Sequence, residues 1–442
     1  MERRKPTTNW TVLLYAAGYN ELAPEIHSSF HAITENLSKK TVVAAQIAKA
    51  PNHLVTSLRP GIRIPDTQAS WHGTRRIAFD GSGEVYCEEM VDMNMADPRH
   101  LAEFIHWGMS KFPAKHFMLV ISGHGAGFVG VVTDYARNLR LIMSFKGFAK
   151  ALQLGIKSTG RRIDLLILDA CHMHMTELWY ELAHLPGNPV QFLITPLGDL
   201  RLEGMPLGDL ISRLAPATYI PPPHLRKLLT DSVQSINDNH DTSSQIMLIE
   251  LNRHYLRCLK NCISNYAHLM PDYLVQNPVR GSTVSLVDML SSSFHNTIGM
   301  KLKNTLYRSL KQICLAPAVR QLQGKHGLGP SLYCPSDKSE YLTYKSHYDC
   351  LLFAQRNHWS KYLEGNNLPL PTPVPLTSIV NTMLQQNPGI TSDQAWETIR
   401  NFGWLRSSVL SNEQLPYMLR DNKPAFQKEA ITAPSRSILI KR

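Results

Sequence analysis

Short, continuous runs of apolar residues recur through the first half of the chain. Each run is bounded by polar or turn-forming residues, and none alternates strictly between apolar and polar positions. Runs of this length and composition are typical of strands that are buried on both faces of a parallel sheet. We therefore predict strands at 11–17, 41–48, 116–122, 163–168 and 190–195, with a shorter strand or hairpin arm at 75–79.

Apolar residues at helical spacing occupy the segments between these runs. Pro24 fits the first turn of one predicted helix, and Asp97-Pro98 is typical of the capped start of another. A further helix is predicted over 145–154, and the long region 207–324 carries helical periodicity without strong strand signals. Strands that alternate with helices in this way predict an α/β fold, with helices packed on a mostly parallel central sheet.

The last part of the chain differs in composition from the rest. Residues 327–333 are expected to return a short strand, after which Leu368–Pro375 forms a polyproline-like spacer. Thr391 and Gln394 beyond the spacer fit a capping box at the start of an amphipathic helix. We therefore predict one large domain over 1–365, a linker over 366–375 and a small helical module over 376–442.

Two chemically distinctive residues lie where predicted parallel strands end. Cys171 follows the strand 163–168, and His124, flanked by Gly123 and Gly125, follows the strand 116–122. The segment between the two strands has room for one crossover helix, so both carboxyl ends meet at the same edge of the sheet. Ligands bind at that edge in open α/β sheets, and the amino end of a following helix favours a thiolate. Cys171 is therefore a candidate nucleophile and His124 its acid–base partner.

Simpler interpretations compete with this one. A single cysteine at a strand end is most often a small buried core residue, whereas the glycines around His124 leave its imidazole uncovered, which a core histidine does not require. The segment Cys171-His172-Met173-His174 also contains metal-ligand types. Neighbouring residues of an extended segment face opposite sides, so these side chains are not expected to ligate one zinc ion.

Two acidic residues are expected near the same edge. Asp169 precedes Cys171 by two positions and points to the same side if the strand continues, which would place its carboxylate at the floor of a pocket. Asp199 lies on the loop after the strand 190–195 and has a similar reach. A loop cap or a surface ion pair is the competing interpretation of Asp199.

Four segments together resemble the clostripain family of cysteine peptidases, which are relatives of the caspases. They are NWTVLLYAAGYNEL, the stretch ending in HFMLVISGHGAGF, LDACHMHMTELWYEL and GLGPSLYCPSDKSEYLTYKSHYDC, in the family's order, so that the resemblance covers roughly 9–363. It implies a caspase-like three-layer α/β/α sandwich and cleavage by a dyad of Cys171 and His124. It also implies an oxyanion site at the amides of Gly125 and Cys171.

The resemblance further implies the substrate class. Acidic residues at the positions of Asp169 and Asp199 bind an Arg or Lys side chain before the cleaved bond, and the match is closer for Asp169. The expected partner is thus a protein or peptide substrate with Arg or Lys at that position. No membrane is expected as a partner.

The chain departs from the family pattern at two positions. Tyr19 stands where the family usually carries Asp, which weakens any inference of a calcium site, and no cofactor is predicted. His174 stands where a small residue usually follows the nucleophile by three positions, and it is expected to reshape the pocket rim. Crowding of the thiol by His174 would favour an alternative function, a catalytically weak scaffold that presents the C-terminal module to a partner.

A zymogen is also predicted. Several members of the family are activated by self-cleavage, and others that resemble this chain are intracellular caspase-like effectors of bacterial immune systems that another protease switches on. The segment 134–140 is expected to be an exposed polar link after the His124 strand, and Arg137-Asn138 is a bond of the kind this pocket should accept. The loop 157–162 is the competing site, but it lies at the opposite edge of the sheet.

Charge and cysteine content bear on the class of partner and on the cellular compartment. The formal net charge is +11 and the isoelectric point is about 9.2, but the basic residues are scattered, which favours a solvated surface over nucleic-acid binding. The seven cysteines form no framework spacing, and the chain shows neither an export signal nor a membrane-spanning run. We therefore expect a cytoplasmic protein.

Overall fold

The computed structural model describes residues 8–365, apart from 36, 65–70, 92, 137–140, 217, 242–244, 270–282, 292–296, 324, 326 and 336. The predicted linker over 366–375 and the helical module over 376–442 lie outside the described residues.

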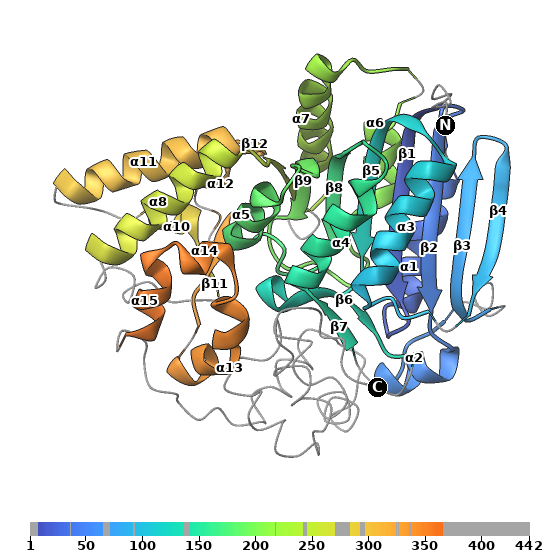
Figure 1. Cartoon of the computed structure of the whole chain (residues 1–442), viewed down its shortest axis with the longest axis horizontal. Coiled ribbons are helices and arrows are strands. Elements are labelled where there is room, and N and C mark those ends of the chain that lie inside the picture. The colour runs from blue at the N-terminus through green and yellow to red at the C-terminus, as the bar shows by residue number, and fades with distance from the viewer. Residues whose placement is uncertain are drawn as a thin grey trace.

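A nine-stranded sheet forms the centre of the molecule (Figure 1). Its strand order is β12-β10-β9-β8-β5-β1-β2-β3-β4. The five strands from β9 to β2 in this order run parallel to one another, and the strands at both edges are antiparallel. The bounds are β1 Thr8–Gly18, β2 Thr41–Lys49, β3 Gly73–Asp80, β4 Gly83–Met90, β5 Ala114–Ser122, β8 Ile163–Asp169, β9 Val190–Pro196, β10 Ile246–Glu250 and β12 Cys314–Ala316.

The continuous apolar runs form the buried strands, as predicted. Leu13 and Leu119 on one face of the sheet and Met118 and Ile167 on the other are all inaccessible to solvent. A strand covered on both faces needs apolar residues at successive positions, which explains why these runs do not alternate. The predicted α/β class with a mostly parallel central sheet is confirmed.

Helices cover both faces of the sheet and complete three layers (Figure 1). One face packs against α1 (Ala23–Thr34), α6 (Leu207–Leu214) and α7 (Pro222–Asn239). The other face packs against α3 (Pro98–Lys111), α4 (Phe145–Lys157) and α5 (Thr176–His184). The structure thus has the α/β/α sandwich of a caspase-like fold. Among the described residues, no helix combines the length and the apolar character that a membrane span requires.

The helix starts follow the local signals in the sequence. The side chain of Asp97 accepts a hydrogen bond from the amide of Arg99, and Pro98 occupies the first turn of α3. Pro24 lies in the first turn of α1, where its missing amide proton costs nothing. These starts set the direction in which α1 and α3 return along the sheet.

The region 207–324 is more mixed than predicted, because it contributes two strands to the sheet. β10 pairs with β9, and β12 pairs with β10. The small strands β11 (Thr283–Ser285) and β13 (Ser331–Tyr333) form a separate pair, and β13 falls within the predicted strand at 327–333. The remaining elements are α2 Asn52–Leu58, α8 Arg253–Leu269, α10 Leu286–Ser291, α11 Thr297–Ile313, α12 Val319–Leu322, α13 Lys338–Tyr348, α14 Leu352–Gln355, α15 His358–Glu364 and the 3-10 turn η2 Gly127–Val129.

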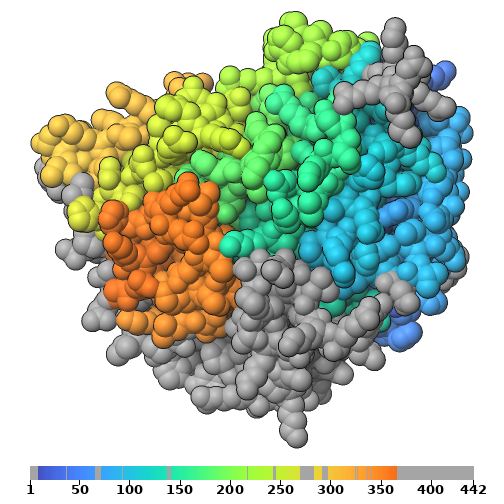
Figure 2. Space-filling model, in the orientation of Figure 1, coloured from blue at the N-terminus to red at the C-terminus, as the bar shows by residue number. Residues whose placement is uncertain are grey.

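The last described helices close one side of the molecule. Figure 2 shows them in orange beside the green and yellow helices of the sandwich. Helix α14 contacts α5, and α15 contacts α8. The main chain of Tyr333 accepts a hydrogen bond from the indole of Trp359 at 2.7 Å, which joins α15 to β13. This closing segment therefore supports the helix that follows Cys171.

The expectation of an exposed link over 134–140 is wrong at its start. The chain forms a hairpin there, from β6 (Gly130–Asp134) and β7 (Leu141–Ser144). Asp134 is buried, because its carboxylate accepts hydrogen bonds from the amides of Met95 at 2.7 Å and Ala136 at 2.8 Å. Arg137 and Asn138, which flank the proposed cleavage site, lie outside the described residues.

Candidate active site

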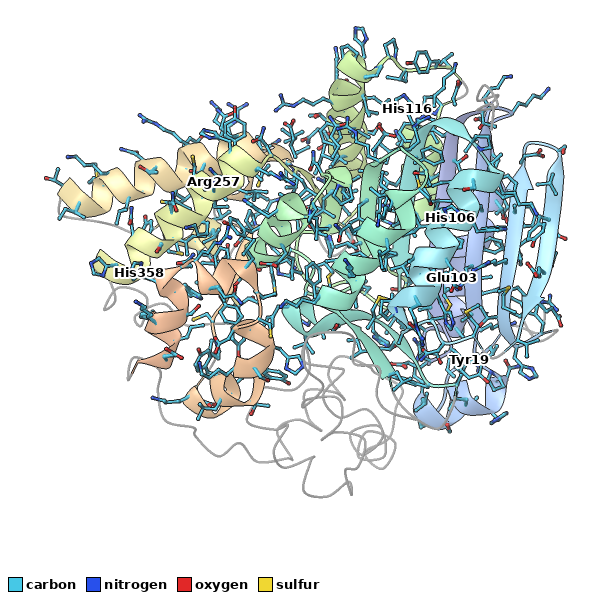
Figure 3. All side chains as sticks on the ribbon, viewed as in Figure 1. Tyr19, Glu103, His106, His116, Arg257 and His358 are labelled. Carbon is cyan, nitrogen blue, oxygen red and sulfur yellow. The ribbon has the colours of Figure 1, made fainter. Side chains whose placement is uncertain are left out.

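The carboxyl ends of the parallel strands gather at one edge of the sheet. Figure 3 labels a residue near each end of these strands. His116 lies near the amino end of β5, and Tyr19, which directly follows β1, lies at the carboxyl ends. Strands β5 and β8 pair so that Ser122 lies opposite Asp169. His124 and Cys171 each follow two residues later, so both lie on adjacent loops at the same edge.

The two loops touch through their backbones. The amide of Gly123 donates a hydrogen bond to the carbonyl of Asp169 at 3.2 Å. A Cβ atom at Gly125 would lie 2.3 Å from the carbonyl oxygen of Cys171 and 3.0 Å from the Cβ of Ala170. Only glycine permits this approach, so the Gly-His-Gly sequence allows the His124 loop to lie directly against the Cys171 loop.

Cys171 does not lie at a helix terminus, in contrast to the prediction. Helix α5 begins at Thr176, and the chain between β8 and α5 makes a turn in which His172 has a φ of 60°. A left-handed conformation is uncommon for a residue with a Cβ and indicates a constrained turn. The helix dipole falls off within the first turn, so it gives the Cys171 thiol little support.

Cys171 is partly accessible as a residue, although its thiol lies in a buried environment. Its Sγ donates a hydrogen bond to the carbonyl oxygen of Leu200 at 3.9 Å. Burial raises the pKa of Cys171 to about 12, and the nearby carboxylates of Asp199 and Asp169 act in the same direction. Thiolate is the reactive form of cysteine, so this arrangement keeps the thiol unreactive near neutral pH.

Asp169 is buried beneath the loop that follows β9. Its Oδ2 accepts a hydrogen bond from Ser122 Oγ at 2.7 Å, and its Oδ1 accepts one from the amide of Met205 at 2.7 Å. A Cβ atom at Gly204 would lie 2.8 Å from Asp169 Oδ1. Burial raises the pKa of Asp169 to about 6, although both hydrogen bonds favour its ionised form. The carboxylate lies at the predicted edge, but backbone of this chain covers it.

Asp199 lies close to His172. Its Oδ1 is 3.1 Å from His172 Nδ1, and its side chain remains 44% exposed. His174 is buried nearby, and burial lowers the pKa of its imidazole to about 4, so this ring is neutral at physiological pH. The main-chain carbonyl of His174 accepts a hydrogen bond from the amide of Ser331 at 3.0 Å, which ties the turn to β13. His174 therefore packs into the base of the turn.

Metal ligands do not converge in this turn. Within the described parts of 8–365, no three His, Cys, Asp or Glu side chains form a group that could hold a metal ion. Tyr19 takes part in main-chain pairing, since its carbonyl accepts a hydrogen bond from the amide of Tyr135 at 3.1 Å.

Sequence reasoning did not identify Glu21, which lies on the loop between β1 and α1. Its side chain is fully buried, and its Oε1 is 3.0 Å from His124 Nε2. This contact becomes an ion pair when the imidazole is protonated. One signal was available: Asn20 and Glu21 are polar residues directly after a buried strand, at the same edge as His124.

Comparisons with known proteins agree with this architecture. The model of the clostripain family of peptidases matches residues 63–195, a segment that includes His124 and Cys171. No curated protein matches the chain significantly in sequence.

Two solved structures share the fold. One is a secreted C11 cysteine protease from Bacteroides thetaiotaomicron in complex with an irreversible peptide inhibitor, with a TM-score of 0.55 and 15% identity over 80% of this chain and 99% of that one. The other is an inactive zymogen C11 protease from Parabacteroides distasonis, with a TM-score of 0.52 and 16% identity over 79% of this chain and 99% of that one. The family match shows that residues 63–195 resemble the clostripain family of cysteine peptidases, and the two solved structures show that the chain shares its fold with C11 cysteine proteases.

Proposed function

We propose that this chain is a cysteine endopeptidase that cleaves after Arg or Lys, with Cys171 as nucleophile and His124 as its acid–base partner. The observation that carries the proposal is the contact between their two loops. A residue with a Cβ atom at position 125 would prevent this contact, because the Cβ would collide with the carbonyl oxygen of Cys171. This contact holds a thiol and an imidazole at the edge of the sheet where ligands bind in α/β folds.

The reaction proposed is acyl transfer. His124 takes the thiol proton, and the thiolate of Cys171 attacks the carbonyl carbon of the scissile peptide, whose π electrons move to oxygen. Collapse of this intermediate breaks the C–N bond while His124 returns the proton to the leaving amine. Water then attacks the thioester, His124 accepts one of its protons, and the acid product leaves as the thiol is regenerated.

Two backbone amides support an oxyanion site. Among the described residues, neither Gly125 nor Cys171 donates a hydrogen bond through its amide. The bridge between Gly125 and Val131 uses the amides of Ala126 and Val132 instead. Free amides at the reacting centre match what a developing oxyanion requires.

The preference for Arg or Lys rests on Asp169. A carboxylate buried near the nucleophile is costly unless a cation or several hydrogen bonds compensate its charge. Ser122 and Met205 supply two hydrogen bonds, and a substrate guanidinium or ammonium would supply the missing positive charge. Asp199, on the same loop as Met205, provides a second carboxylate.

We further propose that the described state is latent. The loop 197–205 contacts three parts of the site at once: the carbonyl of Leu200 meets the Cys171 thiol, Asp199 pairs with His172, and the amide of Met205 binds Asp169. Opening of this loop would expose the thiol and the pocket together. One of the two solved structures that share the fold is an inactive zymogen, so a latent state is known on this fold.

Cleavage at Arg137-Asn138, by the protease itself or by an upstream protease, is the proposed trigger. The hairpin β6–β7 joins both sides of this segment to the His124 loop, since the amide of Val132 donates to the carbonyl of His124 at 2.9 Å. A cut there would break the covalent link between β6 and β7. All seven cysteines are free, which supports the proposal of a reducing, cytoplasmic setting.

The experiment that tests the function uses the full chain with and without limited trypsin treatment. Arginyl, lysyl and glutamyl reporter peptides are compared, with Cys171→Ala treated in parallel to subtract residual trypsin. Hydrolysis of only the basic reporters, lost in Cys171→Ala, supports the proposal. Equal hydrolysis by wild type and Cys171→Ala at every stage would reject it.

A catalytically weak scaffold is the second candidate, because the raised pKa of Cys171 gives a physical basis for low reactivity. Alkylation separates the two functions. A scaffold would leave Cys171 unmodified by an arginyl chloromethyl ketone under every activating condition, whereas a latent protease would be labelled once the chain is cut.

A further inference from the structure

Glu21 lies on a loop that several long-range contacts hold in place. The side-chain amide of Asn20 donates to the carbonyl of Ala17 at 2.9 Å and to Thr133 Oγ1 at 3.0 Å. Asn20 Oδ1 accepts a hydrogen bond from the amide of Leu22 at 2.9 Å, which closes the turn around Glu21. The contact with Thr133 ties this loop to β6, the strand beside the His124 loop.

Arg59 holds the same loop from the other side. Its Nη1 donates to the main-chain carbonyl of Glu21 at 3.2 Å, and its Nη2 pairs with the carboxylate of Glu25 at 2.7 Å. The main chain on both sides of Glu21 is thus fixed. A side chain on such a rigid loop has a defined direction, which is what the orientation of a second group requires.

The direction of the Glu21 carboxylate is toward His124. Its Oε1 lies 3.0 Å from His124 Nε2, and Glu21 is fully buried while the imidazole is 14% exposed. A carboxylate at this distance attracts the positive charge that the imidazole gains when it accepts a proton during the reaction. The buried Nε2 faces Glu21, so Nδ1 is the nitrogen left for the reacting atoms.

We propose that Glu21 is a positioning residue that fixes the ring of His124, stabilises its imidazolium form and directs Nδ1 to the leaving amine. This inference rests on the proposed peptidase function. It adds a carboxylate behind the histidine of a site for which the sequence predicts only a dyad. Glu21 acts through His124 and does not touch the substrate.

Other titratable groups at this edge also face the site, so a test must separate them from Glu21. Cys171 and Asp169 lie on the β8 side, and Asp134 and Tyr135 lie at the end of β6. None of these four is changed by a substitution at Glu21. Changes that follow such a substitution therefore report the contact with His124.

The test compares Glu21→Gln and Glu21→Asp in the full chain, with Glu35→Gln as a matched control. Glu35 is an exposed acid at the end of α1. Glu21→Gln should lower kcat by about tenfold to a hundredfold with KM nearly unchanged, because it removes a charge-assisted contact. Glu21→Asp should recover part of this loss, and Glu35→Gln should behave as wild type.

The pH profile gives a readout that a purely structural role would not move. Without the carboxylate, His124 loses its proton more easily, so the alkaline limb of the kcat profile should move about one pH unit lower in Glu21→Gln. A fall in kcat with unmoved limbs and no recovery in Glu21→Asp would overturn the proposal. Wild-type kcat in Glu21→Gln would overturn it as well.

A second measurement does not depend on peptidase activity. In the Cys171→Ala background, ¹⁵N-histidine NMR follows the titration of His124, which is assigned by its loss in His124→Gln. The His124 resonance should titrate at lower pH when Glu21→Gln is added, and identical titration would overturn the inference. If the wild-type chain cleaves no reporter, the proposed function fails, while this measurement still decides whether Glu21 controls His124.

Discussion

The two halves of the candidate site differ in their state. On the histidine side, Glu21 is already 3.0 Å from His124 on a loop that Asn20 and Arg59 hold rigid. On the cysteine side, the thiol donates to Leu200, and burial raises its pKa to about 12. The acid–base half is therefore preorganised, whereas the nucleophile half is closed. The difference suggests that activation has to act on one side only.

The loop 197–205 accounts for the closed side. It covers the thiol with a backbone carbonyl and covers Asp169 with a backbone amide, so one movement would release both nucleophile and pocket. On the other side, the imidazole of His124 is 14% exposed, and its Nε2 lies 3.0 Å from Glu21 Oε1. Substitutions on the two sides should test this difference, and the largest effect is expected at the dyad.

Loss of either dyad residue should have the largest effect. In the activated protein, Cys171→Ala and His124→Ala should each lower kcat/KM on an arginyl reporter by about a thousandfold or more, because the two act as one unit. The double variant should be no worse than the single variants. Steady-state kinetics measures this, with circular dichroism to show that the fold is kept. Near-normal turnover by Cys171→Ala would contradict the assignment.

The reactivity of the thiol should change almost as much upon activation. At pH 8, Cys171 in the uncut chain should react with iodoacetamide about a thousandfold more slowly than an ordinary exposed thiol, because its thiolate fraction is so small. Cys87, which is exposed, is the internal control. Peptide mass spectrometry gives both rates. Equal rates for Cys87 and Cys171 in the uncut chain would show that the site is not closed.

The pocket should contribute a smaller but clear effect. Asp169→Asn should lower kcat/KM on arginyl reporters by about tenfold to a hundredfold, since it removes the charge that we propose faces the substrate guanidinium. Hydrolysis of a neutral reporter should change far less. Competition between arginyl and norleucyl reporters checks this ratio. An equal fall for both reporters would mean that Asp169 serves only to hold Ser122 and Met205.

The same carboxylate predicts a pH dependence. Burial in the closed state raises the pKa of Asp169 to about 6. Opening of the loop 197–205 in the cut chain would lower this pKa toward its ordinary value, since the burial is relieved. The ratio of kcat/KM for arginyl over norleucyl reporters, which cancels the titration of the dyad, should therefore stay nearly constant from about pH 8 to 6 and fall only below about pH 5. A fall of the ratio between about pH 7 and 6 would show that Asp169 stays buried after the cut.

The smallest effect is expected at Asp199, an exposed residue of the loop 197–205. Asp199 pairs with His172, but its side chain is 44% exposed, so the pair contributes little energy. Asp199→Asn should raise the rate of Cys171 alkylation in the uncut chain by no more than about fivefold. A complete release of the thiol would mean that this pair, and not the contacts of Leu200 and Met205, keeps the loop closed.

Much of this architecture follows from local sequence patterns. The continuous apolar runs predicted the parallel strands, and Asp97-Pro98 predicted the start of α3, because burial on two faces and helix capping depend on nearby residues. β10 and β12 were missed because they are short segments in a helical region, and only their pairing with β9 makes them strands.

The site was less predictable than the fold. The positions of His124 and Cys171 follow from the ends of two strands, and so could be anticipated. Glu21 and Leu200 reach the dyad from loops that are distant in sequence, and the Leu200 contact uses a main-chain carbonyl, which carries no residue-specific signal. For the same reason, the composition of the loop 197–205 did not reveal its closed state.

The central claim is that Cys171 is a latent nucleophile that works with His124. The most direct test is mass spectrometry of the full chain after treatment with an arginyl chloromethyl ketone, before and after limited proteolysis. The account predicts stoichiometric labelling of Cys171 only after the cut, and no labelling in activated His124→Ala. Labelling of other cysteines with Cys171 untouched in the cut chain, or equal labelling of Cys171 without His124, would contradict it.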